Sequence, residues 1–468
     1  MSNLILMTDG YKASHFKQYP PGTQGMFSYL ESRGGTYDRT LFFGLQYLLK
    51  KYLWNPITHQ DVDEARDFFA AYGTPFPEAG WRRIVDVHKG RLPVRIRAVP
   101  EGLVVPIRNA LLTVESLDPE VFWIVTWVET FLMRLWYPIT VATQSWHIRR
   151  MIRGYLNDTG GSAESLDFKL HDFGARGVSS AESAGIGGAS HLAAGWLGSD
   201  TVEGVVLANR YYDCPMAAYS IPASEHSTIT AWGPEHEKDA FLNMLTQFGG
   251  PGKIVACVSD SFDIFKAVDF WISISEEIKA TGTTLVIRPD SGDPKTIVLD
   301  ILRRFRDARM HTVNQQGFDV LPSHFRIIQG DGVNQHSIGS ILQAMYDSGF
   351  AADNLAFGMG GALLQKVDRD TQKFAYKCSA VKIEDDHGNG MWHDVYKDPV
   401  TDPGKKSKRG RLDLTGSLAD GFNTVRLDGA QTWDSVMRTV YEPGVACTPT
   451  TLTAVRALAQ AAMEKADG

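Results

Sequence analysis

Short apolar runs recur from residue 168 onward, and each ends in a polar or glycine-rich cluster. Most are followed by a segment with helical periodicity. The runs are 168–174, 195–200, 217–220, 253–261, 284–292, 325–332, 355–362 and 374–379. Apolar strands that alternate with helices favour a parallel sheet, because such strands are buried on both faces. Eight of them predict a (β/α)8-like irregular barrel of the α/β class.

The segments on either side of these runs have a different pattern of apolar residues. Residues 44–54 have the period of a helix, and residues 93–107 alternate like two strands around a Pro-Glu-Gly turn. A chain of 468 residues is also long for a single core. We therefore predict an α+β domain formed by residues 1–164 and completed by the C-terminal segment 382–468, with the barrel domain at 165–381.

Composition narrows the class of protein. Hydrophobic residues at 43% and charged residues at 22% are typical of a globular chain, and the net charge of −7 offers no general attraction to nucleic acid or an anionic membrane. The most apolar window, 121–142, contains Glu129 and Arg134, which favours a buried helix over a membrane span. The N-terminus lacks a signal-peptide pattern, and the four cysteines form no C-x-x-C pair. We expect a cytoplasmic protein with no nucleic-acid or membrane partner.

Several common catalytic motifs are missing from the sequence. It has no G-x-x-x-x-G-K-[ST], G-x-G-x-x-G or G-x-S-x-G, and HEKDA at 236–240 lacks the second histidine of a zinc protease. The sequence therefore contains no motif that would support P-loop phosphoryl transfer, hydride transfer, serine hydrolysis or zinc proteolysis.

Groups that bind phosphate and magnesium gather instead at the predicted carboxyl ends of the strands, where barrel enzymes place their chemistry. Gly330–Gly332 and Gly358–Gly361 offer backbone amides that an anion can approach closely. The cations and carboxylates of this set are Arg176, Arg288, Arg369, Lys377, Lys397, Asp260, Asp263, Asp290 and Asp331. Each aspartate alone is more often a turn former. Together at the same end of the predicted barrel, however, these groups indicate a polyphosphate site.

Two further segments have alternative interpretations. The C-terminal segment contains a basic loop at 397–412, where six Lys and Arg residues stand against two Asp between Lys397 and Arg411. It is either a solvated surface loop or a flap that closes over phosphates. The stretch SIPASEHSTITAW, 220–232, contains His226 among hydroxyl side chains. A single histidine in such a setting is often a capping or core group, and a functional role requires partners.

The sequence resembles the nicotinamide phosphoribosyltransferase family nearly end to end, in order and with matching spacing. The motifs that carry the resemblance are DGYKASHFKQYPPGT (9–23), HDFGARGVSSAESAGIGGASHL (171–192), SIPASEHSTITAWG (220–233), VSDSFDIF (258–265), IRPDSGDP (287–294), IQGDGV (328–333) and KDPVTDPGKKSKRGRL (397–412). The resemblance implies transfer of the 5-phosphoribosyl group of 5-phosphoribosyl-1-pyrophosphate (PRPP) to nicotinamide. It also implies Mg2+, coupling to ATP hydrolysis, and a homodimer with its active sites at the subunit interface.

The resemblance also implies substrate-binding residues. Phe173 would stack on one face of the pyridine ring, and the partner subunit's Tyr11 would stack on the other. Asp200 and Arg288 would bind the carboxamide. The residues implied for phosphate and ribose are Arg176, Ser259, Gly330, Asp331, Gly360, Gly361, Arg369, Lys377, Lys397 and the partner subunit's Arg33.

Three residues are implied for catalysis. Asp263 and Asp290 would lie near the magnesium and the ribose, and His226 would be the residue that ATP phosphorylates. The pyridine nitrogen attacks with a free lone pair, so the transfer itself needs no general base. A histidine near the pyrophosphate, with Asp263 orienting its other ring nitrogen, is therefore placed to accept a phosphoryl group.

Other functions remain open from the sequence. A nicotinate phosphoribosyltransferase would differ in whether Asp200 faces the carboxyl position of the acceptor, and Asp200 could instead cap a helix that begins at Thr201. A non-catalytic sugar-phosphate-binding protein would be expected to lack His226, Asp263 or Asp290, and all three are present. A magnesium-dependent lyase or aldolase is a third alternative, but Lys377 is its only candidate Schiff-base residue, which is weak support.

Overall fold

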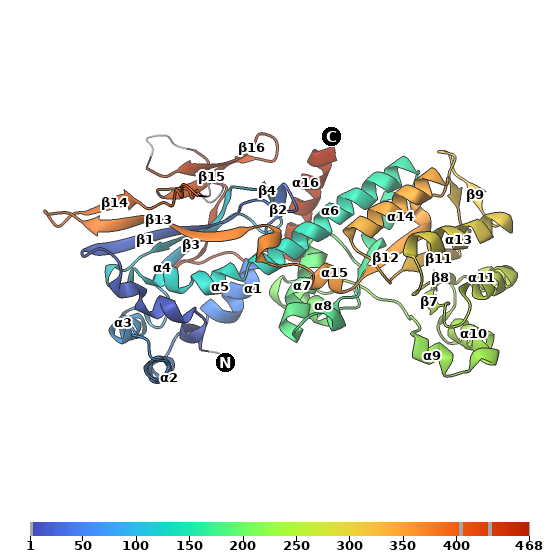
Figure 1. Ribbon diagram of the computed structural model, residues 1–468, viewed down its shortest axis with the longest axis horizontal. Helices are drawn as coiled ribbons and strands as arrows, with labels where there is room; N and C mark the ends of the chain where they lie inside the picture. Colours follow the sequence, from blue (N-terminus) through green and yellow to red (C-terminus); the bar gives the residue numbers. More distant parts are fainter. Residues whose placement is uncertain (1–2, 402–405, 429–432, 468) are drawn as a thin grey trace. The chain divides into compact units, whose positions relative to one another are not determined.

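The computed structural model describes residues 3–401, 406–428 and 433–467 (Figure 1). The chain divides into two compact units. The first, Met1–Thr143 with Arg210–Cys214 and Val367–Gly468, is called the sheet unit here. The second, Gln144–Asn209 with Pro215–Lys366, is called the barrel unit. The predicted barrel domain, 165–381, covers most of the barrel unit.

The sheet unit is built around a six-stranded antiparallel sheet in the order β14-β13-β1-β5-β3-β17. The strands are β1 (Thr23–Ser32), β3 (Val94–Ala98), β5 (Ala110–Ser116), β13 (Phe374–Glu384), β14 (Gly390–Asp394) and β17 (Arg438–Tyr441). Two small ribbons pair β2 (Arg39–Leu41) with β4 (Val104–Pro106), and β15 (Leu412–Ser417) with β16 (Gly421–Arg426). Strands from both ends of the chain share one sheet, which confirms the predicted α+β domain built from N- and C-terminal segments.

The α-helices of the sheet unit are α1 (Leu45–Leu48), which a π-turn at Leu49–Leu53 extends, α2 (His59–Tyr72), α3 (Glu78–His88), α4 (Ile124–Trp127), α5 (Glu129–Met133) and α16 (Leu452–Asp467). Helix α6 (Trp136–Asp158) begins in this unit, and its residues from Gln144 onward belong to the barrel unit. Short 3₁₀ turns are Leu4–Leu6, Gly10–Lys17, Pro119–Val121 and Arg369–Thr371. The apolar window 121–142 is buried as predicted, but it forms α4, α5 and the start of α6 rather than one helix. In the described part of the chain, no helix combines the length and apolarity needed to cross a membrane.

The barrel unit contains a five-stranded parallel sheet in the order β6-β12-β11-β8-β7. Its strands are β6 (Leu170–Asp172), β7 (Ile254–Val258), β8 (Thr284–Arg288), β11 (Phe325–Gln329) and β12 (Leu355–Met359). Isolated parallel bridges join Asp172 to Ser199, Gly198 to Tyr219 and Ala223 to Ala256. These bridges carry the pairing from β6 round to β7, so the sheet closes into an irregular barrel, as predicted.

Three of the eight predicted barrel strands do not form regular strands of the barrel in the structure. Residues 195–200 and 217–220 contribute only single bridges to the ring. The eighth run, 374–379, lies in β13, which pairs antiparallel with β1 in the sheet unit, so its prediction as a barrel strand was wrong. A short apolar run does not identify its partner, because strand pairing depends on residues far away in the sequence.

Along the chain of the barrel unit, helices alternate with the barrel strands (Figure 1). They are α7 (Ala181–Ala193), α8 (Val202–Tyr211), α9 (His226–Thr230), α10 (Glu237–Phe248), α11 (Ile264–Ser273), α12 (Ser275–Thr281), α13 (Pro294–Asp307), α14 (Gln335–Asp347) and α15 (Gly361–Leu364), with 3₁₀ turns at Ala163–Phe168, Ala175–Gly177, Pro234–His236 and Ala352–Asn354, and a hairpin of β9 (Thr312–Val313) and β10 (Asp319–Val320). Local sequence explains α13, since Asp293 accepts the Thr296 amide proton and Pro294 occupies the first turn. Its buried face contains Val298, Ile301 and Phe305.

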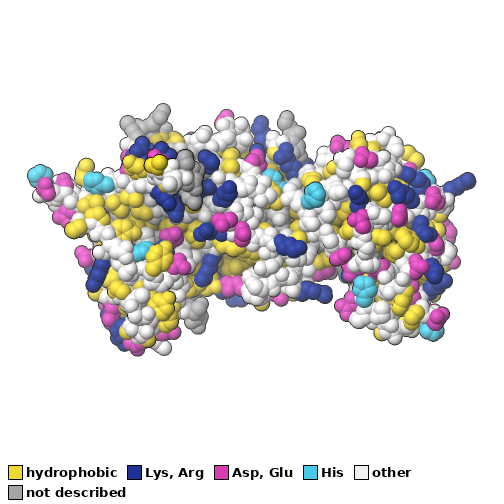
Figure 2. All heavy atoms as spheres, in the orientation of Figure 1, with side chains coloured by type: hydrophobic (Ala, Val, Ile, Leu, Met, Phe, Trp, Pro, Cys, Tyr) yellow, Lys and Arg dark blue, Asp and Glu magenta, His cyan; other side chains and the backbone are white. Residues whose placement is uncertain are grey.

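Acidic and basic side chains are interspersed over the visible face in Figure 2, in keeping with the modest net charge of −7. Attraction to a polyanion would therefore come from a local cluster of cations rather than from the surface as a whole.

Candidate active site

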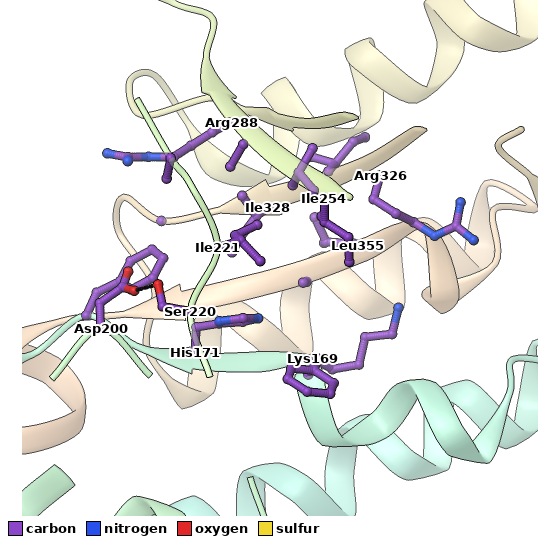
Figure 3. Close-up of a pocket in the computed structure, with 18 of the residues that line it drawn as sticks. Lys169, His171, Asp200, Ser220, Ile221, Ile254, Arg288, Arg326, Ile328 and Leu355 are labelled. Atoms are coloured by element: carbon purple, nitrogen blue, oxygen red, sulfur yellow. Dashed lines mark hydrogen bonds between the residues drawn. The ribbon is translucent and has the colours of Figure 1, made fainter. Parts of the chain in front are cut away.

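A cavity of about 940 Å³ runs along the interior of the barrel unit. It reaches from the first residues of β7, β8 and β12 to the residues that follow the strands, such as Asp290, Gly330 and Gly360. Figure 3 shows Arg288 and Asp200 at one end, Lys169 and Arg326 at the other, and apolar side chains between them. The inward side chains Ala256, Val286 and Ile328 are small or medium-sized, which leaves the barrel interior open enough for a ligand.

An aromatic ring lies at the carboxyl end of this cavity. Phe173 follows β6, and its backbone amide donates to the carbonyl of Met359 at 3.0 Å. Its ring lies against the backbone of β12, because a Cβ atom on Gly358 would be only 2.0 Å from its Cε2 atom. A Cβ on Gly330 would lie at an ordinary 3.4 Å from the same atom. The glycine at 358 therefore sets the position of the ring.

Asp200 and Arg288 line the same end of the cavity (Figure 3). The Asp200 carboxylate accepts a hydrogen bond from the Ser220 hydroxyl. Helix α8 begins at Val202, whose amide donates to the backbone carbonyl of Asp200 rather than to its side chain. Arg288 ends β8, and its Nη2 donates to Asp290 Oδ2 at 2.9 Å. An acceptor and a donor thus stand at one end of an apolar cavity, beside an aromatic ring.

His226 is the first residue of α9 and is about half exposed. Its Nε2 lies 3.1 Å from Asp260 Oδ1, and its Nδ1 lies 3.8 Å from Asp290 Oδ2. The Asp260 side chain is 3% exposed, and its Oδ2 accepts the Asp290 amide proton at 3.0 Å and the Ser291 hydroxyl proton. Histidine, two carboxylates and a guanidinium therefore form one hydrogen-bonded group at the ends of β7 and β8.

Asp263 does not orient His226, contrary to our expectation. It is the N-cap of α11 and accepts the amide protons of Phe265 at 3.0 Å and Lys266 at 3.2 Å. These bonds hold the pKa of the Asp263 carboxyl below its usual value. Asp260 takes the place beside the imidazole that the family resemblance implied for Asp263.

The remaining candidates of the barrel unit fall into two groups. Arg176, Gly330, Gly360 and Gly361 line the cavity. Arg176 is exposed, and among the described residues it has no ion-pair partner. A Cβ on Gly177 would lie 3.0 Å from the Gly361 Cα, so the turn that carries Arg176 approaches the start of α15 closely.

Ser259 and Asp331 are placed differently. The Ser259 side chain is fully buried, where its hydroxyl donates to the Cys257 carbonyl and accepts from Trp271 Nε1. Asp331 is exposed, and its carbonyl accepts from Gln329 Nε2. Neither side chain lies among those that line the cavity.

The other predicted residues belong to the sheet unit. Tyr11 is 64% exposed, on the 3₁₀ turn Gly10–Lys17. Arg33 Nε donates to Glu31 at 2.8 Å, and burial lowers the pKa of the Lys377 ammonium in β13. Arg369 is exposed and lies 3.6 Å from Asp370. Their roles remain predictions.

Part of the predicted basic loop, 402–405, lies outside the described residues. In the described part, the backbones of Lys397 and Ser407 are linked, because the Ser407 amide donates to the Lys397 carbonyl at 2.9 Å. Lys408 pairs with Glu31, and Lys406 pairs with Asp398 at 2.8 Å. These pairs anchor the base of the loop.

Sequence reasoning missed the polar residues that line the other end of the cavity. Lys169 Nζ is buried, donates to the Asp353 carbonyl at 2.6 Å and lies 3.0 Å from the Asp353 carboxylate. Burial lowers the pKa of the Lys169 ammonium and of the His171 imidazole. A signal was present, since Lys169, His171 and Phe173 alternate along β6 and its flanks, and alternate residues of a strand face the same side.

One buried carboxyl was also missed. Asp172 is fully buried at the end of β6, and burial raises its pKa to about 7. Its Oδ1 accepts the Gly174 amide proton at 2.7 Å. A carboxyl in such a site is protonated at mildly acidic pH, and no feature of the sequence pattern distinguishes it from a surface aspartate.

The described residues contain no group of three or more His, Cys, Asp or Glu side chains arranged to hold a metal ion. Magnesium in polyphosphate sites is commonly held by one or two carboxylates together with substrate phosphates. Asp290 meets that requirement at the cavity, because it lines the wall beside the guanidinium of Arg288. The donor set therefore fits a magnesium ion that arrives with a polyphosphate.

Comparisons with known proteins identify the family of this chain. The family described as nicotinate phosphoribosyltransferase (NAPRTase) matches residues 168–444, and the N-terminal domain of nicotinamide phosphoribosyltransferase matches residues 3–96. The nicotinamide phosphoribosyltransferase of Xanthomonas campestris pv. campestris is 55% identical over 99% of both chains. That of Acinetobacter baylyi is 32% identical over 97% of this chain and 96% of its own.

Two solved structures share the fold. Human nicotinic acid phosphoribosyltransferase superposes with a TM-score of 0.60 at 18% identity, covering 98% of this chain and 94% of its own. Nicotinate-nucleotide pyrophosphorylase from Pyrococcus furiosus gives a TM-score of 0.60 at 14% identity, covering 100% and 97%. The fold, the matched domains and the full-length relatives lead to one conclusion. The chain belongs to the nicotinate phosphoribosyltransferase family and carries the N-terminal domain of the nicotinamide phosphoribosyltransferases.

Proposed function

We propose that this chain transfers the 5-phosphoribosyl group of PRPP to nicotinamide, giving nicotinamide mononucleotide and pyrophosphate in NAD salvage. The observation that carries the proposal is that Asp200 and Arg288 lie at the same end of the cavity, which Phe173 also lines. The relative that is 55% identical over the full length is named for the same acceptor, which supports it.

The choice of acceptor follows from hydrogen-bonding chemistry. A carboxamide has an NH2 donor for the Asp200 carboxylate and a carbonyl acceptor for the Arg288 guanidinium. Nicotinate has only acceptors and a negative charge. Two unit charges about 4 Å apart repel each other by about 4 kcal/mol at an effective dielectric constant near 20, before solvent and Arg288 reduce the effect. This repulsion favours nicotinamide over nicotinate.

The transfer step depends on charge stabilisation rather than on a base. The pyridine nitrogen attacks C1 of the ribose with a free lone pair, while the bond from C1 to the pyrophosphate oxygen breaks. The barrier lies in separating pyrophosphate from an oxocarbenium-like ribose, which cations and backbone amides stabilise. We assign Arg176 and the amides around Gly360 and Gly361 to a phosphate in the barrel unit. Arg33, Arg369, Lys377 and Lys397 remain candidates for further phosphate contacts.

Magnesium would be held by Asp290 together with the phosphates of the substrate. When bound, it would neutralise charge on the leaving pyrophosphate. Asp290 is fixed for this role by its ion pair with Arg288 and by the bond from its own amide to Asp260.

We further propose that ATP phosphorylates His226 and that hydrolysis of the phosphohistidine drives turnover. His226 combines partial exposure with a buried carboxylate partner, as a nucleophilic histidine requires. The chain is also proposed to act in the cytoplasm as a homodimer, in which the partner subunit's Tyr11 covers the second face of the acceptor ring. The described chain has free cysteines, which suits a reducing compartment.

Chromatographic detection of nicotinamide mononucleotide from nicotinamide, PRPP and magnesium tests the transfer, and a parallel reaction with nicotinate tests the acceptor. If product formed in the reaction with nicotinate and not in the reaction with nicotinamide, the assignment of the acceptor would be refuted. For the coupling, His226→Ala should abolish ATP hydrolysis while some ATP-independent transfer persists, because transfer needs no base. ATP hydrolysis at the wild-type rate in this variant would contradict the phosphohistidine.

A further inference from the structure

On the basis of the proposed function, we infer that Asp172 is a positioning residue of the acceptor site, because it ties the turn that carries Phe173 to the segment that carries Asp200. Asp172 is the last residue of β6, and Phe173 follows it directly. The Asp172 side chain is fully buried and does not line the cavity. Its effect on the acceptor therefore passes through these two neighbours.

The side chain of Asp172 fixes the turn after β6. Its Oδ1 atom accepts the amide proton of Gly174 at 2.7 Å, so the carboxyl closes a turn around Phe173. The turn is tight, since a Cβ atom on Gly174 would lie 2.6 Å from the side chain of Leu364 and 2.9 Å from the same Oδ1. Without this acceptor the buried Gly174 amide would lose its partner, and the direction of the Phe173 ring would no longer be fixed at this point.

Asp172 also contacts the second arm of the site. Its carbonyl accepts the amide proton of Asp200 at 2.9 Å, and it forms a parallel bridge with Ser199. Its Oδ2 atom and the Thr201 side chain lie over the same glycine, because a Cβ atom on Gly188 would be 3.3 Å from that oxygen and 3.1 Å from Thr201 Cγ2. One buried residue therefore holds the segments that carry Phe173 and Asp200 in a fixed relation.

Two buried oxygens beside this junction lack hydrogen-bond partners. Within the described ranges, neither Asp172 Oδ2 nor Thr201 Oγ1 completes a hydrogen bond. Burial raises the pKa of Asp172, and the Gly174 amide and the Thr201 hydroxyl offset only part of that rise. A neutral carboxylic acid has a proton that can bond to a hydroxyl oxygen, whereas a carboxylate would place an unpaired charge there. The junction is therefore most stable when Asp172 is protonated.

Nearby charges act in the same direction. Burial is the largest cause that raises the pKa of Asp172 to about 7, and the negative charges of Asp200 and Glu203 add to it. Asp200 lies on the adjoining segment, and Glu203 lies in the first turn of α8. Strand β12 and helix α7 contribute Met359 and Gly188, which carry no charge. As pH rises through about 7, the ionised Asp172 is repelled by Asp200, which should loosen the acceptor site.

The first test separates positioning from stability by kinetics at about pH 6, where Asp172 is neutral. Asp172→Ala removes the acceptor of the Gly174 amide. We expect KM for nicotinamide to rise by about 10-fold or more, while KM for PRPP changes by less than about 2-fold. The matched control is Asn354→Ala, which removes the buried acceptor of the Leu321 amide, at 2.9 Å, and does not line the cavity. It should lower the unfolding free energy and leave both KM values unchanged.

The second test uses the pH dependence of KM for nicotinamide. In the wild type it should rise above about pH 7 by up to about 10-fold per pH unit, because only neutral Asp172 holds both segments in place. Asp172→Asn keeps an oxygen for the Gly174 amide and an NH2 group for the Thr201 hydroxyl. Its KM should match that of the wild type at about pH 6 and stay level as pH rises. Groups that titrate in both proteins cancel in the ratio of the two KM values.

The outcomes distinguish this inference from the proposed function. If the wild type forms no nicotinamide mononucleotide, the proposed function and the inference fail together. If the wild type is active and Asp172→Ala raises both KM values alike, or raises neither, Asp172 is only a structural residue and the inference alone is overturned. A ratio of the wild-type KM to that of Asp172→Asn that stays constant with pH would also overturn it. This second measurement decides the question even if Asp172→Ala fails to fold.

Discussion

Gly358→Ala should displace the Phe173 ring and impair acceptor binding. Gly358 lies in β12, where it pairs with His171, and its φ is not in the positive region, so alanine fits the backbone. The added Cβ, however, would lie 2.0, 2.2 and 2.7 Å from three carbon atoms of the Phe173 ring. Carbon atoms in van der Waals contact are about 3.5–4.0 Å apart. The ring must therefore move by roughly 1.5 Å.

The magnitude follows from two opposing effects on stability. Forcing an extra methyl group into a packed site costs about 1–3 kcal/mol. Replacing glycine by alanine in a strand returns roughly 0.5–1 kcal/mol. A net loss of about 0–2.5 kcal/mol in unfolding free energy is expected from these two ranges, and urea unfolding measures it. Misplacing a binding group by 1 Å can lower the rate by about 100-fold, so kcat/KM for nicotinamide should fall by a similar factor.

A double-mutant cycle with Phe173→Ala separates the clash from other effects. In that background the added methyl group of Gly358→Ala has no ring to displace, so the loss of stability should disappear, while kcat/KM stays low. Gly154→Ala in α6 is the matched control, because nothing lies within 4 Å of its added Cβ, and it should stabilise the chain by about 1 kcal/mol. If Gly358→Ala behaves like Gly154→Ala and leaves kcat/KM unchanged, the reasoning about the ring is refuted.

Three other predictions concern Asp200, the proposed subunit interface and a buried carboxyl. Asp200→Ser should lower the ratio of kcat/KM for nicotinamide over nicotinate by about 100-fold, since it removes the charge that opposes nicotinate; an unchanged ratio would remove Asp200 from acceptor choice. If the proposed homodimer has twofold symmetry and a site completed by the partner subunit's Tyr11, mixing inactive Tyr11→Ala and Phe173→Ala subunits should restore about one intact site per heterodimer; no recovery in exchanged dimers would count against such a site. The folded pKa of Asp172 is raised to about 7, so the native state binds the proton more tightly than the unfolded chain. The wild type should therefore lose stability relative to Asp172→Asn by up to about 1.4 kcal/mol per pH unit as pH rises from about 4 towards 7; a pH-independent difference in urea unfolding would contradict the raised pKa.

Much of the architecture was predictable from local sequence. The strands β7, β8, β11 and β12 were found as apolar runs, because a buried parallel strand is apolar on both faces. The site end of the barrel was predicted from the polar residues after those strands, and the structure brings Phe173, Asp200, Arg288 and Asp290 to one cavity. Buried strands and the polar residues that follow them are defined by residues close together in the chain, so a single sequence is enough to find them.

The sequence by itself therefore determined the family, the barrel class and the types of group available for catalysis. Only the tertiary structure decided which partner each group has. Asp260 and Asp263 stand three residues apart after β7 with the same side chain, and the fold directs one to His226 and the other to a helix cap. Residues 374–379 are as apolar as a barrel strand, yet they pair with β1. Pairing and side-chain direction depend on contacts between residues far apart in the chain, and no local pattern encodes that choice.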